Sequence, residues 1–216
     1  MTNYETFKVF LESLARPYGI SVQTNLHETS YDTSRIPMVY VYDDIRNQLS
    51  VIDMDAFSQK VFTRLKYSAS ELTGQKDLNK LAISTVDALI IDKNNEWYFI
   101  EFKNQKYSNS KESVNKKAYQ NYFLLTSLFY DYAQKYKNPF FDKSKPLQFA
   151  KNHITYILVV SEEENQRDVP KMHNLSLAGE FFRPDYMDRL RHYLFKDAYV
   201  YLPSDFERDF VRKFAY

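Results

Sequence analysis

Apolar residues recur at helical spacing in three segments of the chain. The first covers residues 5–15, and a proline and a glycine that follow it are residues that end helices. The second covers residues 54–66. The third is the longest: it follows a predicted capping box at residues 109–112 and runs to residue 138. Its apolar positions are Val114, Ala118, Tyr122, Leu125, Phe129 and Tyr132.

Shorter apolar runs predict strands. Residues 154–160, ITYILVV, are continuously apolar, which is typical of a strand covered on both faces. Residues 38–42 and 49–52 flank the polar segment DDIRNQ and predict a hairpin. A second hairpin is predicted over residues 86–103, where two apolar segments meet at a polar turn, and residues 198–202 predict a further strand.

The remaining segments complete the order of elements. Residues 25–34 read as a polar connector and 139–151 as a loop, while 68–80 are polar and indicate no definite element. A charged loop follows the buried strand, a helix is predicted over 184–195, and a closing helix begins at a capping box over 204–207. The expected fold class is α/β (α+β). It has a central mixed sheet flanked by helices, an N-terminal helix and hairpin, and a C-terminal helix-strand-helix addition.

Composition excludes several kinds of site. The chain has no cysteine, which rules out disulfides, thiolate zinc sites and a cysteine nucleophile. Three glycines, far apart, cannot form a Walker loop or a GxGxxG turn, and neither HExxH nor GxSxG occurs. No apolar run approaches the roughly 20 residues of a membrane span. We expect one domain over residues 1–216, in the cytoplasm and without a membrane partner.

Charge is distributed unevenly although the net charge is only +1. Residues 93–151 contain 11 Lys and no Arg against 5 acids, an excess that can attract phosphate. A solvated helix face followed by a lysine-rich loop explains the same excess equally well. Aromatic residues make up 17% of the chain, and core packing is the simpler explanation for them.

The second predicted hairpin carries the main chemical signal. Its first strand begins with Asp87, and its second strand ends in Glu101-Phe102-Lys103. Strand alternation places Glu101 and Lys103 on one face of the second strand, with Phe102 on the other. Two carboxylates and an ammonium on one patch can hold a divalent metal and a water beside a phosphodiester.

The turn decides whether Asp87 joins this patch. A two-residue turn at Asn94-Asn95 would place Asp87 opposite Phe102, facing away from Glu101. A three-residue loop with Asn95 in left-handed geometry would pair Asp92 with Glu96 and place Asp87 opposite Glu101. We expect the three-residue loop or a bulged equivalent, because an unpartnered acid on an apolar face is costly.

These residues resemble the PD-(D/E)XK, or restriction-endonuclease-like, nuclease superfamily. The resemblance rests on Asp87, Glu101 and Lys103, on their hairpin, and on the helix and buried strand that follow; it covers about residues 54–160. Val86 stands where the motif has its proline. The resemblance implies a central mixed sheet of the restriction-endonuclease-like type and a Mg²⁺ or Mn²⁺ ion held by Asp87, Glu101 and the Phe102 carbonyl. It also implies that Lys103 orients the attacking water.

The resemblance implies further site residues. An acid on the preceding helix often assists the metal, and Glu71 is the candidate here. A Gln or Lys on the following helix often faces the site, which indicates Gln120 together with Lys116 or Lys117. Asp53 and Asp55 can supply a ligand, but acids at the start of a helix explain them better. The lysines expected to contact nucleic-acid phosphates are Lys106, Lys111, Lys116 and Lys117.

The sequence therefore favours a metal-dependent nuclease that hydrolyses phosphodiester bonds in DNA, with RNA as the less favoured substrate. The main alternative is a non-catalytic nuclease-like fold that serves as a nucleic-acid or protein-binding module. A structural or oligomerising protein with aromatic interfaces is a third interpretation. The oligomeric state is open, a homodimer included.

Overall fold

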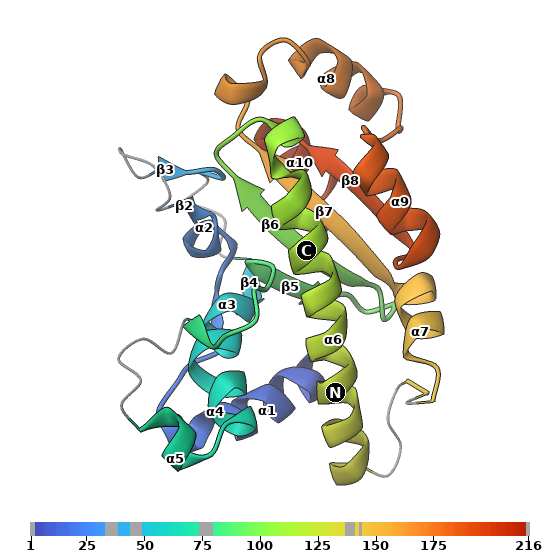
Figure 1. The fold of residues 1–216 in the computed structure, drawn as a ribbon. Helices are drawn as coiled ribbons and strands as arrows, with labels where there is room; N and C mark the ends of the chain where they lie inside the picture. The colour runs from blue at the N-terminus through green and yellow to red at the C-terminus, as the bar shows by residue number, and fades with distance from the viewer. Residues whose placement is uncertain are drawn as a thin grey trace.

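A six-stranded sheet forms the centre of the protein (Figure 1). The computed structural model describes residues 3–32, 39–43, 49–73, 80–136, 141–142 and 144–214. Neighbouring strands of the sheet follow the order β1-β4-β5-β6-β7-β8. They are β1 (Gln23–Asn25), β4 (Ser50–Asp53), β5 (Ala88–Ile91), β6 (Trp97–Lys103), β7 (Ile154–Val160) and β8 (Asp197–Tyr201). A separate small sheet pairs β2 (Tyr31–Asp32) with β3 (Val39–Tyr40).

Helices surround this sheet. They are α1 (Asn3–Ala15), α2 (Leu26–Thr29), α3 (Met54–Phe57), α4 (Thr63–Lys66), α5 (Ala69–Leu72), α6 (Lys111–Lys135), α7 (Pro146–His153), α8 (Val169–Leu177), α9 (Asp185–Tyr193) and α10 (Pro203–Asp209). A π-helical turn, Ser58–Phe62, joins α3 to α4, and a 3-10 turn, Tyr107–Ser110, leads into α6. The protein is therefore an α/β protein with a mixed sheet flanked by helices.

Strand directions divide the sheet into two halves. From β1 to β6 each pair is antiparallel, whereas β6, β7 and β8 run parallel. Parallel neighbours need crossover connections, and α6 with α7 supplies the one between β6 and β7. Strand β6 thus lies between the antiparallel β5 and the parallel β7, and the connection that leads into α6 begins at its carboxyl end.

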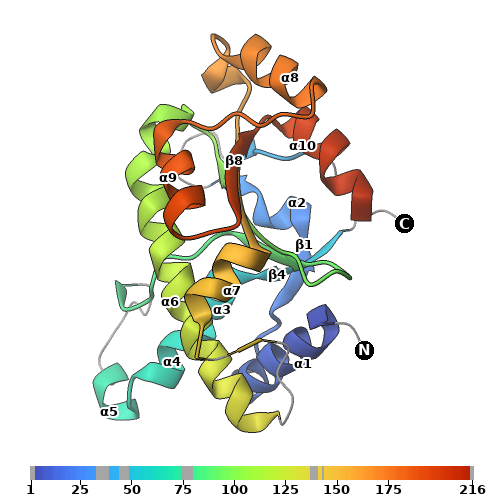
Figure 2. The same ribbon diagram turned by 90° about the vertical axis from the view of Figure 1, so that its right-hand side faces the viewer.

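Both faces of the central strands are covered. On one face Trp97, Phe99 and Tyr156 pack with apolar residues of α1 and α6. On the other, Ile100 and Phe102 pack with Phe206 of α10. Figure 2 shows α6 and α9 on one side of the sheet and α10 on the other. This double cover explains why every residue of β7 is buried, as the sequence predicted.

Aromatic rings account for much of this packing. The Trp97 ring lies 5.0 Å from Phe7, 5.6 Å from Phe129 and 5.5 Å from Phe149, each in an edge-on arrangement. Phe206 and Phe210 stack at 5.1 Å on the opposite face. Many of the aromatic residues therefore serve the core, which is the simpler of the explanations considered from composition.

Several predicted elements are confirmed. Helix α1 begins two residues before the predicted segment and ends at Ala15, and α6 ends at Lys135. The hairpin of β5 and β6, the buried strand β7, helix α9 and strand β8 also lie where apolar spacing predicted them. The segment 54–66 is helical but contains the π turn, and one of its apolar residues, Leu65, is exposed.

The predicted hairpin of residues 38–42 and 49–52 is wrong. Within the described residues β3 pairs with β2, and β4 pairs with β1 and β5. Strand β1 ends at the first residue of the stretch expected to be a polar connector, and β2 lies within it, so the polar composition did not indicate these two short strands. The turn residues 44–48 and residue 38 lie outside the described residues.

Helix starts and loops account for the other corrections. The predicted capping boxes over 109–112 and 204–207 do not coincide with the helix starts: the N-cap residues are Ser110 for α6 and Leu202 for α10, and neither forms a side-chain cap bond. Helix α7 occupies part of the segment expected to be a loop and begins at Pro146, a residue that suits the first helical turn. Helix α8, which sequence patterning did not predict, follows the charged loop after β7. No helix in the described part of the chain has the length and apolar character needed to cross a bilayer.

Candidate nuclease-like site

The loop between β5 and β6 sets the register of the hairpin. The Asp92 N–H donates to the Glu96 carbonyl over 2.9 Å, so these two residues face each other across a three-residue loop. Asn95 has a φ of 63°, in the left-handed region. Ala88 pairs with Ile100, which places Asp87 opposite Glu101. The predicted three-residue loop is confirmed, and the two-residue turn is wrong.

Asp87 is attached to β6 through its side chain as well as by register. Its Oδ2 accepts a hydrogen bond from the Phe102 N–H over 2.7 Å. The Phe102 side chain is buried on the opposite face of the sheet with Phe206, as strand alternation predicted. The backbone of Phe102 therefore belongs to the site, and its ring belongs to the core.

Glu101 and Lys103 lie on the same face of β6. Glu101 is fully buried at 0% exposure, and Lys103 Nζ lies 2.6 Å from its Oε1. The buried Glu101 carboxylate therefore has an ammonium group directly against one of its oxygens.

Lys117 of α6 completes the group. Its Nζ lies 3.0 Å from Asp87 Oδ1 and 2.8 Å from Glu101 Oε2, and both contacts are hydrogen bonds. The side chain is only 12% exposed. The sequence expected Lys116 or Lys117 to face the site, and Lys117 is the one that does. We call Asp87, Glu101, Lys103 and Lys117 the site cluster.

Burial and neighbouring charges have opposing effects on the pKa values in the site cluster. Burial raises the pKa of the Glu101 carboxyl to about 7, and the charge of Asp87 adds to the effect, against the attraction of Lys117 and Lys103. Burial lowers the pKa of Lys117, but Glu101, Asp87 and Asp55 outweigh it and raise that pKa. Perturbed acids beside a charged ammonium are typical of functional sites.

Asp55 is the acid that the preceding helix contributes. It lies in the first turn of α3, and its Oδ1 accepts a hydrogen bond of 2.6 Å from the Thr85 hydroxyl. Burial raises its pKa, Lys117 opposes the rise, and Asp87 adds to it, so its charge acts on the site cluster. Asp53, by contrast, caps α3 by accepting from the Ala56 N–H, as expected of an acid at a helix start.

Glu71 is not part of the site. It is exposed, and its Oε2 accepts from both the N–H and the hydroxyl of Ser68, which makes it a local cap of α5. Figures 1 and 2 both place α5 well apart from β5 and β6. The structure does not bring Glu71 to Asp87 and Glu101, because its carboxylate binds Ser68 at the start of its own short helix.

Gln120 supports the site from one turn along α6. Its Oε1 accepts a hydrogen bond of 2.7 Å from the Ser84 N–H, in the segment that leads to Asp87. The predicted catalytic assignment does not match this contact, since Gln120 binds backbone and positions that segment. Lys117 occupies the place that the sequence gave jointly to Gln120 and a lysine.

The other predicted phosphate-binding lysines are exposed. Lys106, Lys111 and Lys116 face solvent at or near the start of α6, whereas Lys117 is engaged by the two carboxylates. Helix α6 also exposes an aromatic flank, whose members are Tyr119 at 57%, Phe123 at 61% and Tyr130 at 59% exposure. Helical spacing puts Lys116 on this flank.

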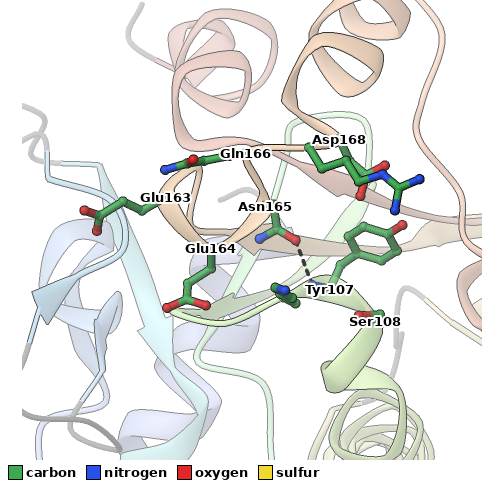
Figure 3. A pocket seen from close by; sticks show the side chains of 9 residues that line it. Tyr107, Ser108, Glu163, Glu164, Asn165, Gln166 and Asp168 are labelled. Carbon is green, nitrogen blue, oxygen red and sulfur yellow. Dashed lines mark hydrogen bonds between the residues drawn. The ribbon is translucent and has the colours of Figure 1, made fainter.

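A polar cleft of about 490 Å³ lies past the carboxyl end of β6, and Figure 3 shows the side chains that line it. It is lined by residues 106–108 and 163–168. Asn165, which is buried, joins its two walls: the side chain donates to the Gln105 and Ser161 carbonyls and accepts from the Tyr107 N–H. The cleft therefore lies at the carboxyl ends of the parallel strands β6 and β7, where open α/β sheets commonly bind ligands.

The site cluster offers oxygen donors for the cation that the resemblance implies. Carboxylate oxygens of Asp87 and Glu101 suit Mg²⁺ or Mn²⁺, and this pair already binds a cation, the ammonium of Lys117. Among the described residues, no group of three or more Asp, Glu, His or Cys side chains is placed to hold a metal ion. The oxygen donors of Asp87 and Glu101 are of the kind that a divalent cation prefers, and the ammonium of Lys117 contacts one oxygen of each carboxylate.

Comparisons of the chain with protein-family models, with curated proteins and with solved structures found no match. The assignment of function therefore rests on the geometry of the site cluster and the cleft.

Sequence patterns did not reveal three sets of contacts in this region. Asp55 was visible as an acid at a helix start, but only its contact with Thr85 separates it from Asp53. Asn165 lies in a charged segment that read as a loop and carried no signal. The hydrogen bond that the Ser84 N–H donates to Gln120 joins residues 36 positions apart, a separation that spacing within one element cannot reveal.

Proposed function

We propose that this protein is a nuclease of the restriction-endonuclease-like type that hydrolyses phosphodiester bonds in nucleic acid, with DNA as the preferred substrate. The observation that supports it best is the register of the hairpin, which sets Asp87 opposite Glu101 with Lys103 on the same face. A surface salt bridge would not require a fully buried glutamate held between two lysines.

Each residue of the site cluster has a role in this proposal. Asp87 and Glu101 would hold a Mg²⁺ or Mn²⁺ ion, which when bound offsets charge on the scissile phosphate and favours deprotonation of water. Lys103, 21% exposed, is the ammonium closest to solvent in the cluster and orients the attacking water. The Phe102 N–H keeps Asp87 in place.

The surroundings fit a polyanionic substrate. The exposed Lys106, Lys111 and Lys116 offer point charges to backbone phosphates near the carboxyl end of β6. The polar cleft beside Lys106 has room for part of a nucleotide, and Tyr107 on its wall offers a ring for stacking. Substrate would thus lie across the start of α6 and reach the site cluster from the solvent side.

The test is a cleavage assay with labelled single-stranded, duplex and branched DNA and with RNA, in Mg²⁺, Mn²⁺ or EDTA. We expect metal-dependent cleavage that falls at least about 100-fold in Lys103→Ala, the size typical of a lost catalytic proton or charge contact. Lys196→Ala is the matched control, because Lys196 forms a salt bridge with Glu96 at the other end of β6. Equal cleavage by wild type and Lys103→Ala would contradict the proposed mechanism.

A second candidate function is a non-catalytic nucleic-acid or protein-binding module. The exposed aromatic flank of α6, with Lys116 beside it, favours this alternative, since rings and lysines together form stacking surfaces for single strands. Absence of cleavage in every arm, together with binding of single-stranded DNA that is lost in Phe123→Ala, would support the module over the nuclease.

A further inference from the structure

We propose that Lys117 is a resident counter-cation of the site, whose ammonium occupies the position between Asp87 and Glu101 and competes there with a divalent cation. The identity of that cation rests on the proposed function. The competition itself rests on contacts that involve only this chain, and it predicts weak metal binding even if no nucleic acid is cleaved.

The four carboxylate oxygens of the pair are all engaged. Lys117 contacts Asp87 Oδ1 and Glu101 Oε2, the Phe102 N–H donates to Asp87 Oδ2, and Lys103 lies against Glu101 Oε1. Each oxygen keeps a further lone pair, but a cation bound between the two carboxylates would occupy the position that the Lys117 ammonium holds. Lys117 is the lysine that contacts both carboxylates, so its departure frees one oxygen on each.

The charge balance leads to the same conclusion. With Glu101 ionised, the two carboxylates of the site cluster face two ammonium groups, and the nearby Asp55 adds one further negative charge. Adding a divalent cation while both lysines remain would still leave an excess of positive charge around a fully buried glutamate, which is unfavourable. Withdrawal of one ammonium reduces that excess, and a lysine has a flexible stem that allows it.

Lys117 is placed to make this exchange. It comes from α6, a separate element from the hairpin that holds Asp87 and Glu101, so it can withdraw without changing their register. Lys116, its neighbour, faces solvent on the same helix. An ammonium that leaves the carboxylates toward solvent enters the surface where the substrate phosphate would lie, and so remains useful to the site.

The experiment compares Mn²⁺ binding by the whole chain and three variants, measured by titration calorimetry. Lys117→Met removes the ammonium and keeps an unbranched apolar stem, and Lys116→Met removes the same charge from the adjacent, exposed position. We expect Lys117→Met to bind Mn²⁺ at least tenfold more tightly than wild type, and Lys116→Met to match wild type. The double variant Asp87→Asn/Lys117→Met should lose the gain.

Thermal unfolding supplies a second readout. In EDTA, Lys117→Met should melt below wild type because two neighbouring carboxylates lose their shared counter-charge, and Mn²⁺ should restore most of the loss. Wild type should respond to Mn²⁺ far less. Mn²⁺ affinity in Lys117→Met equal to or weaker than that of wild type would overturn the proposal.

A labelling experiment on wild type covers the case in which Lys117→Met does not fold. Mn²⁺ that displaces the ammonium should accelerate acetylation of Lys117 by an amine-reactive reagent severalfold, with Lys116 unchanged, as read by mass spectrometry. An unchanged rate at Lys117 under saturating Mn²⁺ would overturn the proposal. Cleavage is not a readout in any arm, so failure of the nuclease assignment and failure of the counter-cation are separate results.

Discussion

Two charged networks in this molecule use similar side chains and reach opposite electrostatic outcomes. The site cluster lies on one face of the sheet. The second network joins α8 to α10, where buried Asp205 accepts from His173 over 2.8 Å and lies 2.9 Å from Arg208. Arg208 also binds Asp209, to which Ser176 donates. We call this second group the α8–α10 network; its members are His173, Ser176, Asp205, Arg208 and Asp209.

The two networks differ in the balance between burial and hydrogen bonding. Burial raises the pKa of Asp209, but the bonds from Arg208 and Ser176 outweigh it, and the net pKa lies below the usual value. Burial of Glu101 wins against two lysines and leaves its pKa at about 7. Donors thus stabilise the acid in the α8–α10 network, whereas the site cluster keeps an acid that is easily protonated. That contrast is the one expected between a structural network and a functional site.

The largest expected effect is on activity and comes from Glu101→Gln. The amide keeps the shape of the side chain and loses the charge that would help hold the cation. We expect cleavage to fall by about a thousandfold, which corresponds to about 4 kcal/mol on the barrier. Fractions cleaved over time, with substrate at saturation, measure it. A Glu101→Gln protein that retains wild-type cleavage would make the site cluster a structural network like the other one.

The next effect is on stability and comes from Asp205→Ala. The change leaves Arg208 and His173 without a buried partner, and we expect the free energy of unfolding to fall by about 3 kcal/mol. Urea unfolding measures it, and cleavage below the melting transition should be unchanged. A large loss of activity in the folded variant would contradict the separation of the two networks.

The pH dependence of stability should have opposite signs in the two networks. Glu101 has a raised pKa, so its contribution to stability is present below about pH 4.5 and is lost as the pH rises through about 7. Wild type should therefore lose roughly 2 to 3 kcal/mol relative to Glu101→Gln across that window. Asp209 has a lowered pKa, so its contribution is present above pH 3.8 and is lost as the pH falls through the folded value.

Urea unfolding of wild type, Glu101→Gln and Asp209→Asn at several pH values tests this. Relative to Asp209→Asn, wild type should lose stability on acidification below pH 3.8. Parallel curves for wild type and Glu101→Gln between pH 4.5 and 7 would show that Glu101 is ionised like an ordinary carboxylate, and the contrast with Asp209 would disappear.

The smallest effect concerns the loop that brings the site cluster together. Asn95 holds a left-handed backbone and accepts a hydrogen bond from Trp97 Nε1 over 2.9 Å. Asn95→Ala should destabilise the protein by about 1 to 2 kcal/mol, because alanine resists this conformation. Asn95→Gly also lacks the hydrogen bond from Trp97, but glycine adopts the left-handed backbone without strain, so this variant should lose less stability. Equal losses in the two variants would assign the role of Asn95 to its side chain alone.

The sequence predicted those parts of the fold and site in which one element carries its own pattern. Alternation along residues 97–103 and the buried character of 154–160 were sufficient to place Glu101, Lys103 and strand β7. The cost of an unpartnered Asp87 was enough to choose the three-residue loop correctly. These inferences need only local geometry and the energetics of burial.

The failures involve partners that are distant along the chain. Strand β4 pairs with β1, where Gln23 lies opposite Ile52, and nothing in either segment identifies its partner. Glu71 resembled a site acid but caps its own helix, whereas Asp55 resembled a helix cap and reaches Thr85. A carboxylate's role depends on which donors tertiary structure brings to it, and that information lies outside any single segment.

The loop at Lys93–Asn95 also has a consequence for descent with modification. All four residues of β5 are apolar and buried, so the strand offers the core acceptable side chains on either face. A lineage that gained or lost one residue in the loop could keep a folded sheet while turning Asp87 away from Glu101. Descendants would then keep the fold but lose the approach of Asp87 to Glu101, and the length of the loop would distinguish the two lineages.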